Sequence, residues 1–268
     1  MPIKTDSSGK RWVEMELVVP GSPEQVWHAV ATGPGNSAWF TKTEIEERVG
    51  GALRFDMGPG MESSGQVTDW EPPRLFGYVE RDWKEGAPPV ATEITVTARS
   101  GDKCVVRMTH SLFASTDDWD GELEGFEGGW PVFFDVLRIY LAQFPGAPGR
   151  GFMAMQPGVA GDALAAWKKL TELTGLAGAD TGDRRSAAEP EAMSGVVAKV
   201  VQDEDLRYLV VRLEEPGPGV LALGAQPGGK GVTVSAVVFC YGDGAEARAE
   251  ATEGPWRQWF ETRFGGAG

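Results

Sequence analysis

The sequence predicts an α+β fold, an antiparallel sheet packed against one long helix, present twice in tandem. Three observations predict it. Short segments of alternating apolar and polar residues follow one another between residues 13 and 113. The stretch EGGWPVFFDVLRIYL at 127–141 then reads as a long helix that is apolar on most sides. The rest of the chain repeats this order more faintly.

The first two elements have clear local signals. Alternate apolar residues from Val13 to Val19 predict a half-buried strand. In PGSPEQVWHAV, Ser22 is the expected N-cap of a short helix, with Pro23 at the first helical position and Gln25 at the third. These residue types at this spacing form a capping box.

Glycine and proline at 33–35 are expected to end that helix. The tetrapeptide SGDK at 100–103 is expected to be a hairpin turn. Further strands are predicted at 43–47, 51–57, 65–70, 75–83, 92–99 and 104–113, before a closing helix that starts near Trp130.

Composition excludes several classes of function. The chain has 268 residues, a net charge of −14 and a pI near 4.7, and so acidic a surface repels phosphate backbones and anionic lipid. No apolar run reaches the roughly 18 residues that span a bilayer, and the N-terminal residues do not resemble a signal peptide. We therefore expect a cytoplasmic protein that binds no nucleic acid or membrane, with Cys104 and Cys240 as reduced thiols.

The second half of the chain reads as a degenerate copy of the first. Trp27 has a counterpart in Trp167 and Gly65 in Gly195, and the aromatic residues of the closing helices also correspond. A proline- and glycine-rich link, FPGAPGRG at 144–151, separates the copies. The expected domains are 10–145 and 151–268. The second is truncated, with a mobile loop near 177–193 where the first half has two strands.

Six segments in order also resemble a known family. They are VVPGSPEQVWHAVAT, AWF at 38–40, GGALRF at 50–55, GQVTDWEPPRLFGYV, VVRMTHSLF and EGGWPVFFDVLRIYL. They resemble the START-like (SRPBCC) superfamily with the birch-pollen-allergen helix-grip fold. The branch they resemble is named for the C-terminal domain of the activator of the heat-shock protein 90 ATPase.

This resemblance implies a curved antiparallel sheet wrapped around a long C-terminal helix, with a cavity between them. It also implies apolar small-molecule ligands, with cyclase or hydrolase activity in a minority of members. The family name alone does not imply a chaperone partner. The truncated second half matches only in outline, which leaves open whether it keeps a cavity.

The candidate ligand site is this cavity in the first domain. Alternation on the strands and the i, i+3, i+4, i+7 spacing on the helix select the side chains that face it. Completely filled space is the competing interpretation. The expected lining is Trp39, Phe40, Phe55, Met57, Tyr78, Met108, His110, Trp130, Phe133, Phe134 and Leu137.

His110 is the one candidate for catalysis. On its strand it shares a face with Met108, so it could orient a ligand oxygen, act as a general base, or simply be a satisfied core histidine. Zinc-site spacings and the G-x-S-x-G elbow are absent from the sequence, so no metal or cofactor is expected. The glycine-rich GAQPGGKG at 224–231 precedes a strand-like segment, which favours a hairpin over a phosphate-binding loop.

Three hypotheses of function remain. The first is binding of a hydrophobic small molecule of lipid, polyketide or aromatic type, without catalysis. The second is a cyclase or hydrolase-like enzyme that uses His110. The third is a protein-interaction or co-chaperone-like module, in which the second domain is a lid or docking surface.

Overall fold

The chain divides into two compact units, Met1–Ala147 and Pro148–Gly268, each with its own sheet. The computed structural model describes residues 3–6, 10–58, 60–81, 83, 86–112, 120–203, 206–228 and 231–265, with the backbone alone at 120–128. No helix within these residues is long and apolar enough to cross a membrane. Cys104 and Cys240 are both free thiols.

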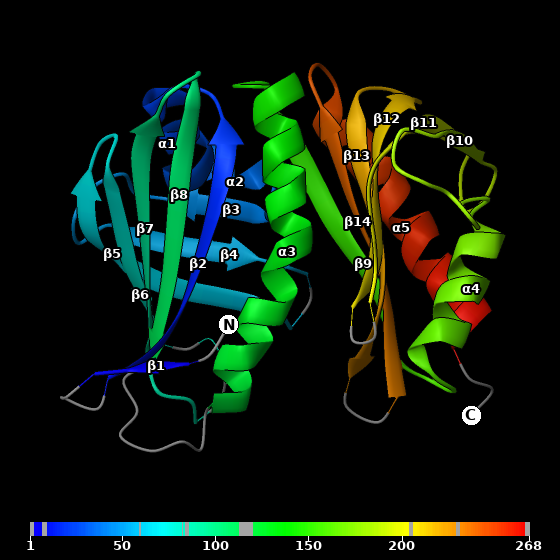
Figure 1. Ribbon diagram of the computed structural model, residues 1–268, viewed down its shortest axis with the longest axis horizontal. Helices are drawn as coiled ribbons and strands as arrows, with labels where there is room; N and C mark the ends of the chain where they lie inside the picture. The colour runs from blue at the N-terminus through cyan, green and yellow to red at the C-terminus, as the bar shows by residue number, and fades with distance from the viewer. Residues whose placement is uncertain are drawn as a thin grey trace. The chain divides into compact units, whose positions relative to one another are not determined.

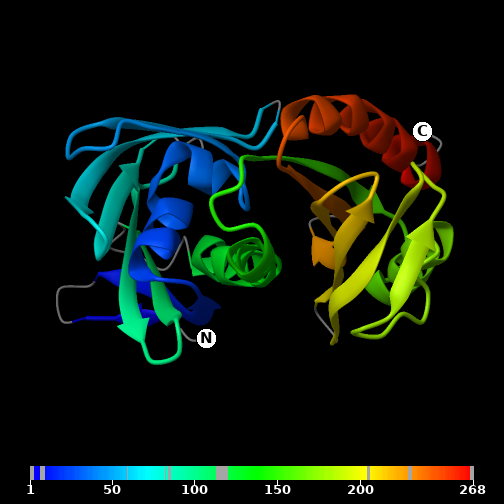
Figure 2. The ribbon, with the colours of Figure 1, turned by 90° about the horizontal axis from the view of Figure 1, so that it is seen from above.

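The first unit is an antiparallel sheet with three helices. The sheet order is β1-β2-β8-β7-β6-β5-β4-β3. Seen along α3, the strands curve around the helices (Figure 2), and α3 packs against β2 and β8 (Figure 1). The elements are β1 (Lys4–Thr5), β2 (Arg11–Pro20), α1 (Pro23–Ala31), α2 (Gly33–Ser37), β3 (Lys42–Ile45), β4 (Ala52–Asp56), β5 (Glu62–Glu71), β6 (Leu75–Glu80), β7 (Val90–Arg99), β8 (Lys103–Leu112) and α3 (Asp120–Gln143).

The start of α1 is as the sequence predicts. Gln25 N–H donates to Ser22 Oγ, and Ser22 N–H donates to Gln25 Oε1 at 3.0 Å, which completes the capping box with Pro23 in the first turn. Because Pro23 has no N–H, three N–H groups are left open at this helix N-terminus, and the capping box satisfies two of them.

Two helix boundaries differ from the prediction. Residues 33–35 do not only end α1: they begin α2, because Thr32 Oγ1 accepts a hydrogen bond from Gly35 N–H at 3.1 Å. A Cβ at Gly35 would lie 1.9 Å from the His28 carbonyl oxygen, so only glycine lets α2 fold back onto α1. The closing helix starts at Asp120 rather than near Trp130 and carries Pro131 in its interior. Acidic residues and leucine favour that extra length, and Pro131 removes one helical hydrogen bond without ending the helix.

The second unit has the same strand order with fewer strands. Its sheet runs β10-β11-β12-β13-β14-β9, which parallels β4-β5-β6-β7-β8-β2 of the first unit, and the tandem fold is thus confirmed. β13 pairs antiparallel with β14 as far as Gly228 opposite Gly231, which agrees with the hairpin expected for 224–231. The elements are β9 (Gly149–Val159), α4 (Ala163–Leu173), β10 (Arg184–Ala187), β11 (Met193–Gln202), β12 (Arg207–Glu215), β13 (Gly219–Gly228), β14 (Gly231–Tyr241) and α5 (Ala245–Phe264).

The predicted loop at 177–193 contains β10, so the absence of a strand there was a wrong expectation. β10 pairs antiparallel with β11, from Arg184 opposite Val196 to Ala187 opposite Met193. It is an edge strand whose residues are exposed or half-buried. An edge strand is held by its backbone and needs no apolar alternation, which is why the pattern missed it.

One glycine pair supports the equivalence of the two units. A Cβ at Gly65 on β5 would lie 2.6 Å from the Val79 carbonyl oxygen, and one at Gly195 on β11 would lie 2.2 Å from that of Arg212. Each glycine therefore admits the same close approach of the next strand.

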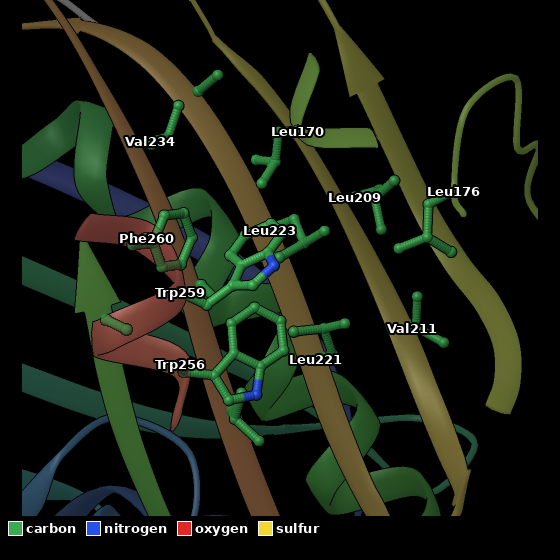
Figure 3. Packing of buried hydrophobic residues seen from close by; sticks show 14 of the residues in the cluster. Leu170, Leu176, Leu209, Val211, Leu221, Leu223, Val234, Trp256, Trp259 and Phe260 are labelled. Carbon is green, nitrogen blue, oxygen red and sulfur yellow. The ribbon is translucent and has the colours of Figure 1, made fainter. Parts of the chain in front are cut away.

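Helix α5 fills the interior of the second unit. Trp256, Trp259 and Phe260 pack against Leu221 and Leu223 of the sheet (Figure 3). The space left beneath β10 to β13 is about 10 Å³, enough for roughly one water.

Candidate functional site

The first unit has a cavity of about 200 Å³, partly open to solvent, between its sheet and α3. Strands β6, β7 and β8 form one wall. Residues 40, 55 and 57 form a second wall, and helix α3 forms a third. The lining residues are Phe40, Phe55, Met57, Tyr78, Glu80, Val90, His110, Gly129, Trp130 and Phe133.

Most of the residues predicted for this site meet at the cavity. Those that do are Phe40, Phe55, Met57, Tyr78, His110, Trp130 and Phe133. The other predicted residues, Trp39, Met108, Phe134 and Leu137, are buried in the surrounding core. Trp39 is held there because its Nε1–H donates to the Ala29 carbonyl at 2.8 Å. Phe134 lies behind Trp130, with ring centroids 5.4 Å apart.

Aromatic rings form a continuous part of the cavity wall. The Phe40 ring centroid lies 4.8 Å from that of Trp130, 5.1 Å from Phe133 and 5.7 Å from Phe55. Phe55 in turn lies 5.5 Å from Tyr78. Because each ring packs on its neighbours, the wall is formed before any ligand arrives.

A row of polar side chains crosses the sheet at the cavity. Tyr78 on β6 is paired with Thr92 on β7, which is paired with His110 on β8. Thr92 Oγ1 and His110 Nδ1 are 2.9 Å apart, and the hydroxyls of Tyr78 and Thr92 are also hydrogen-bonded. The row holds the histidine ring in one orientation, nearly parallel to Trp130.

Burial keeps His110 neutral. Loss of hydration on burial disfavours the imidazolium cation and lowers the pKa of the imidazole to about 4. A base with so low a pKa holds a proton poorly at neutral pH, which disfavours His110 as a general base there. Its geometry suits hydrogen bonding and packing.

Among the described residues that line the cavity, Glu80 has a pKa near neutral pH. Burial raises the pKa of its carboxyl to about 7, although the Ser63 hydroxyl donates a hydrogen bond to it. Burial also raises the pKa of Tyr78, and the adjacent Glu80 adds to that rise. Glu80 is half-buried and lines the cavity, so a ligand in the cavity can reach it.

Sequence reasoning missed Glu80, Thr92, Val90 and Gly129, and for the strand residues a signal existed. Glu80 is two positions from Tyr78, and Thr92 is two positions from Ile94, so strand alternation places both pairs on one face. A glutamate near a strand end normally indicates a solvated position, and that expectation concealed this one.

The described residues contain no group of three His, Cys, Asp or Glu side chains that could hold a metal ion. A second depression, of about 210 Å³, lies beside α4 in the other unit, with Lys168 and Glu172 among its walls. The described wall of this depression has one aromatic residue, Trp167, whereas five aromatic residues line the first cavity, which is therefore the stronger candidate site.

Comparison with known proteins agrees with this fold. Residues 20–142 match the family described as "Activator of Hsp90 ATPase homolog 1-like protein". Residues 20–142 of the first unit are thus similar to this family. The match confirms the START-like superfamily for the Hsp90-activator-like unit, and it spans every described residue that lines the cavity. No curated protein matches the chain.

Solved structures resemble the chain more distantly. Protein MLL2253 from Mesorhizobium loti is 23% identical over 50% of this chain and 98% of its own, with a TM-score of 0.46. CalU16 from Micromonospora echinospora is 21% identical over 53% and 83%, with a TM-score of 0.43. DynU16, a protein in the dynemicin biosynthetic locus, is 20% identical over 85% and 86%, with a TM-score of 0.45.

Proposed function

We propose that the Hsp90-activator-like unit binds a small molecule with an apolar body in the cavity beside α3. The observation that carries this proposal is the preformed aromatic cavity itself, with its few polar groups gathered at one side. Its fold family commonly binds hydrophobic ligands, which supports the same conclusion.

The volume limits the ligand. Pockets for drug-sized molecules measure roughly 300–1,000 Å³. An apolar cavity of about 150 Å³ in another protein takes benzene. The cavity here, at about 200 Å³, therefore suits a single ring or a short alkyl chain, and a polycyclic ligand would have to extend beyond it.

Titration with benzyl alcohol tests the proposal directly. Trp130 lines the cavity, so ligand entry is expected to change tryptophan fluorescence and to raise the Tm of the chain. Saturable binding in the micromolar to millimolar range supports the proposal. If no compound in a panel of single-ring and short-chain molecules changes the fluorescence or the Tm, the proposal is overturned.

A filled cavity supplies the matched variant. Val90 is buried and lines the cavity, so Val90→Phe places a ring in the ligand space. We expect this variant to fold and to lose binding. The control, Val49→Phe, makes the same change at a position that is 61% exposed, and should bind as the wild type does. Equal binding by the two variants would place the ligand elsewhere.

A further inference from the structure

We propose that the cavity selects an organic cation: an amine with a small aromatic or alkyl body, its positive charge placed between the aromatic wall and Glu80. This inference rests on the proposed function, because it names the chemical class of the ligand that the cavity accepts.

The aromatic wall is the first argument. Ring faces carry negative electrostatic potential and attract ammonium groups that lie within about 6 Å of a ring centre. Phe40, Phe55, Tyr78, Trp130 and Phe133 all line this one small space. A cation inside it would lie close to several rings at once. A neutral apolar ligand needs only apolar walls and does not require that they be aromatic.

The placement of Glu80 is the second argument. Among the described residues, its carboxylate accepts a hydrogen bond from Ser63 and forms no ion pair with a basic side chain. The cost of burying this carboxylate is therefore incompletely compensated within the described part of the protein. A cationic ligand beside it would supply the missing counter-charge in surroundings of low dielectric constant.

The other ionisable groups of the cavity do not oppose a cation. Tyr78 from β6 and His110 from β8 face the same space, and both are neutral at pH 7 because burial raises the pKa of the first and lowers that of the second. The helix α3 contributes Gly129, Trp130 and Phe133, which carry no charge, and β7 contributes Val90. A net charge of −14 also draws cations toward the protein.

A neutral ligand that accepts a hydrogen bond from protonated Glu80 is the alternative. It would use the carboxyl group but would gain nothing from the ring faces or from the protein's overall charge. The two cases respond to pH in opposite directions, because the cation needs ionised Glu80 and the neutral acceptor needs the protonated form.

Three probes of nearly equal size separate these cases. Benzylamine is a cation, benzyl alcohol is neutral and benzoate is an anion, and each is small enough for about 200 Å³. With the full chain at pH 8 in calorimetry, we expect benzylamine to bind at least about tenfold more tightly than benzyl alcohol, and benzoate to bind least. Below the Glu80 pKa of about 7, the affinity for benzylamine should fall by nearly tenfold per pH unit, while that for benzyl alcohol stays level or rises.

Glu80→Gln is the decisive variant, and Glu93→Gln is its control. Glu93 lies exposed on β7, so the control removes the same charge without touching the cavity. Glu80→Gln should abolish the preference for benzylamine and its pH dependence and keep the binding of benzyl alcohol. Glu93→Gln should retain both.

Each outcome decides a different point. Equal affinity of the wild type for benzylamine and benzyl alcohol, or a preference for benzoate, overturns the cation inference and leaves the proposed function standing. Failure of all three probes to bind overturns the proposed function as well. If Glu80→Gln does not fold, the pH series on the wild type decides alone, and a benzylamine affinity that does not fall below pH 7 overturns the inference.

Discussion

Glu80 and His110 line the same cavity, yet burial moves their pKa values in opposite directions. The neutral form is favoured in both cases, which is the protonated form of a carboxyl and the deprotonated form of an imidazole. The carboxyl of Glu80 rises from 4.5 to about 7, and the imidazole of His110 falls from 6.5 to about 4. The two groups therefore have opposite effects on how stability depends on pH.

The signs follow from proton binding. Between pH 4 and 6.5, His110 is protonated in the unfolded chain and neutral in the folded chain. Its contribution to the free energy of unfolding is therefore lost as pH falls. Between pH 4.5 and 7, Glu80 is protonated in the folded chain and ionised in the unfolded chain. Its contribution to the free energy of unfolding is therefore lost as pH rises. From 4.5 to 6.5 these two contributions largely cancel in the wild type.

Removing Glu80 should leave the pH dependence of stability that His110 causes without the opposing effect of Glu80. We expect Glu80→Gln to lose free energy of unfolding relative to the wild type as pH falls from 7 to 4.5, by up to about 1.4 kcal/mol per pH unit. Urea unfolding across that range measures the difference. The Glu93→Gln control should show no such slope, and a flat difference for Glu80→Gln would mean that Glu80 is solvated in the folded state.

At the scale of elements, strand register builds the polar part of the site. The three residues Tyr78, Thr92 and His110 are adjacent only because β6, β7 and β8 pair in one register. A shift of one residue in β7 would turn the Thr92 hydroxyl to the opposite face of the sheet. The central threonine therefore connects two rings that are far apart in the sequence.

Thr92→Val should test that connection. Valine keeps the shape but removes the hydroxyl, which leaves hydrogen-bonding groups of Tyr78 and His110 unsatisfied in the core. We expect a loss of about 1–3 kcal/mol in the free energy of unfolding. Thr92→Ser retains the hydroxyl and should lose less. Thr97→Val, at an exposed position of the same strand, should lie within about 0.5 kcal/mol of wild type, and an equally small effect of Thr92→Val would contradict the role given to the row.

Most elements were predictable because they carry local signals. The capping box at Ser22 and the alternation of β2, β7 and β8 depend on residues close together in the chain, and the structure has them as expected. The edge strand β10 and the helix α2 carry no such pattern, because tertiary hydrogen bonds and a tight return onto α1 determine them.

The lining of the cavity was predictable in its apolar part and only in part among its polar residues, since Tyr78 and His110 were expected there and Glu80 was not. Strand and helix periods place Phe55, Tyr78 and Trp130 on inward faces, and all three line the cavity. The same periods do not show which inward side chains border empty space, so Trp39 and Leu137 were included although they are packed. Whether Glu80 is buried depends on neighbours distant in the sequence.

At the scale of the whole molecule, the two copies use the same helix position differently. In the first unit Trp130 borders the cavity, while its counterpart Trp256 in the second unit is completely buried. The segment before β11 secures that packing, because Glu189 accepts from the Trp259 indole N–H at 2.9 Å and also pairs with Arg263. The second interior thus keeps its aromatic residues as core.

This difference predicts that a ligand binds to and stabilises the first unit. Every described residue that lines the cavity lies in Met1–Ala147, so a chain ending at Ala147 contains the described wall. We expect it to fold, judged by circular dichroism, and to bind benzyl alcohol within about twofold of the full chain. In the full chain, ligand at 100 times its Kd adds about 2.7 kcal/mol to the free energy of unfolding of the unit that binds it, since only the folded site binds.

Hydrogen exchange should show that added protection on β6 to β8 and α3, with β11 to β14 unchanged. Equal protection of both sheets would mean that the units unfold as one or that a second site exists, and loss of binding by a folded 1–147 chain would mean that residues beyond Ala147 complete the site.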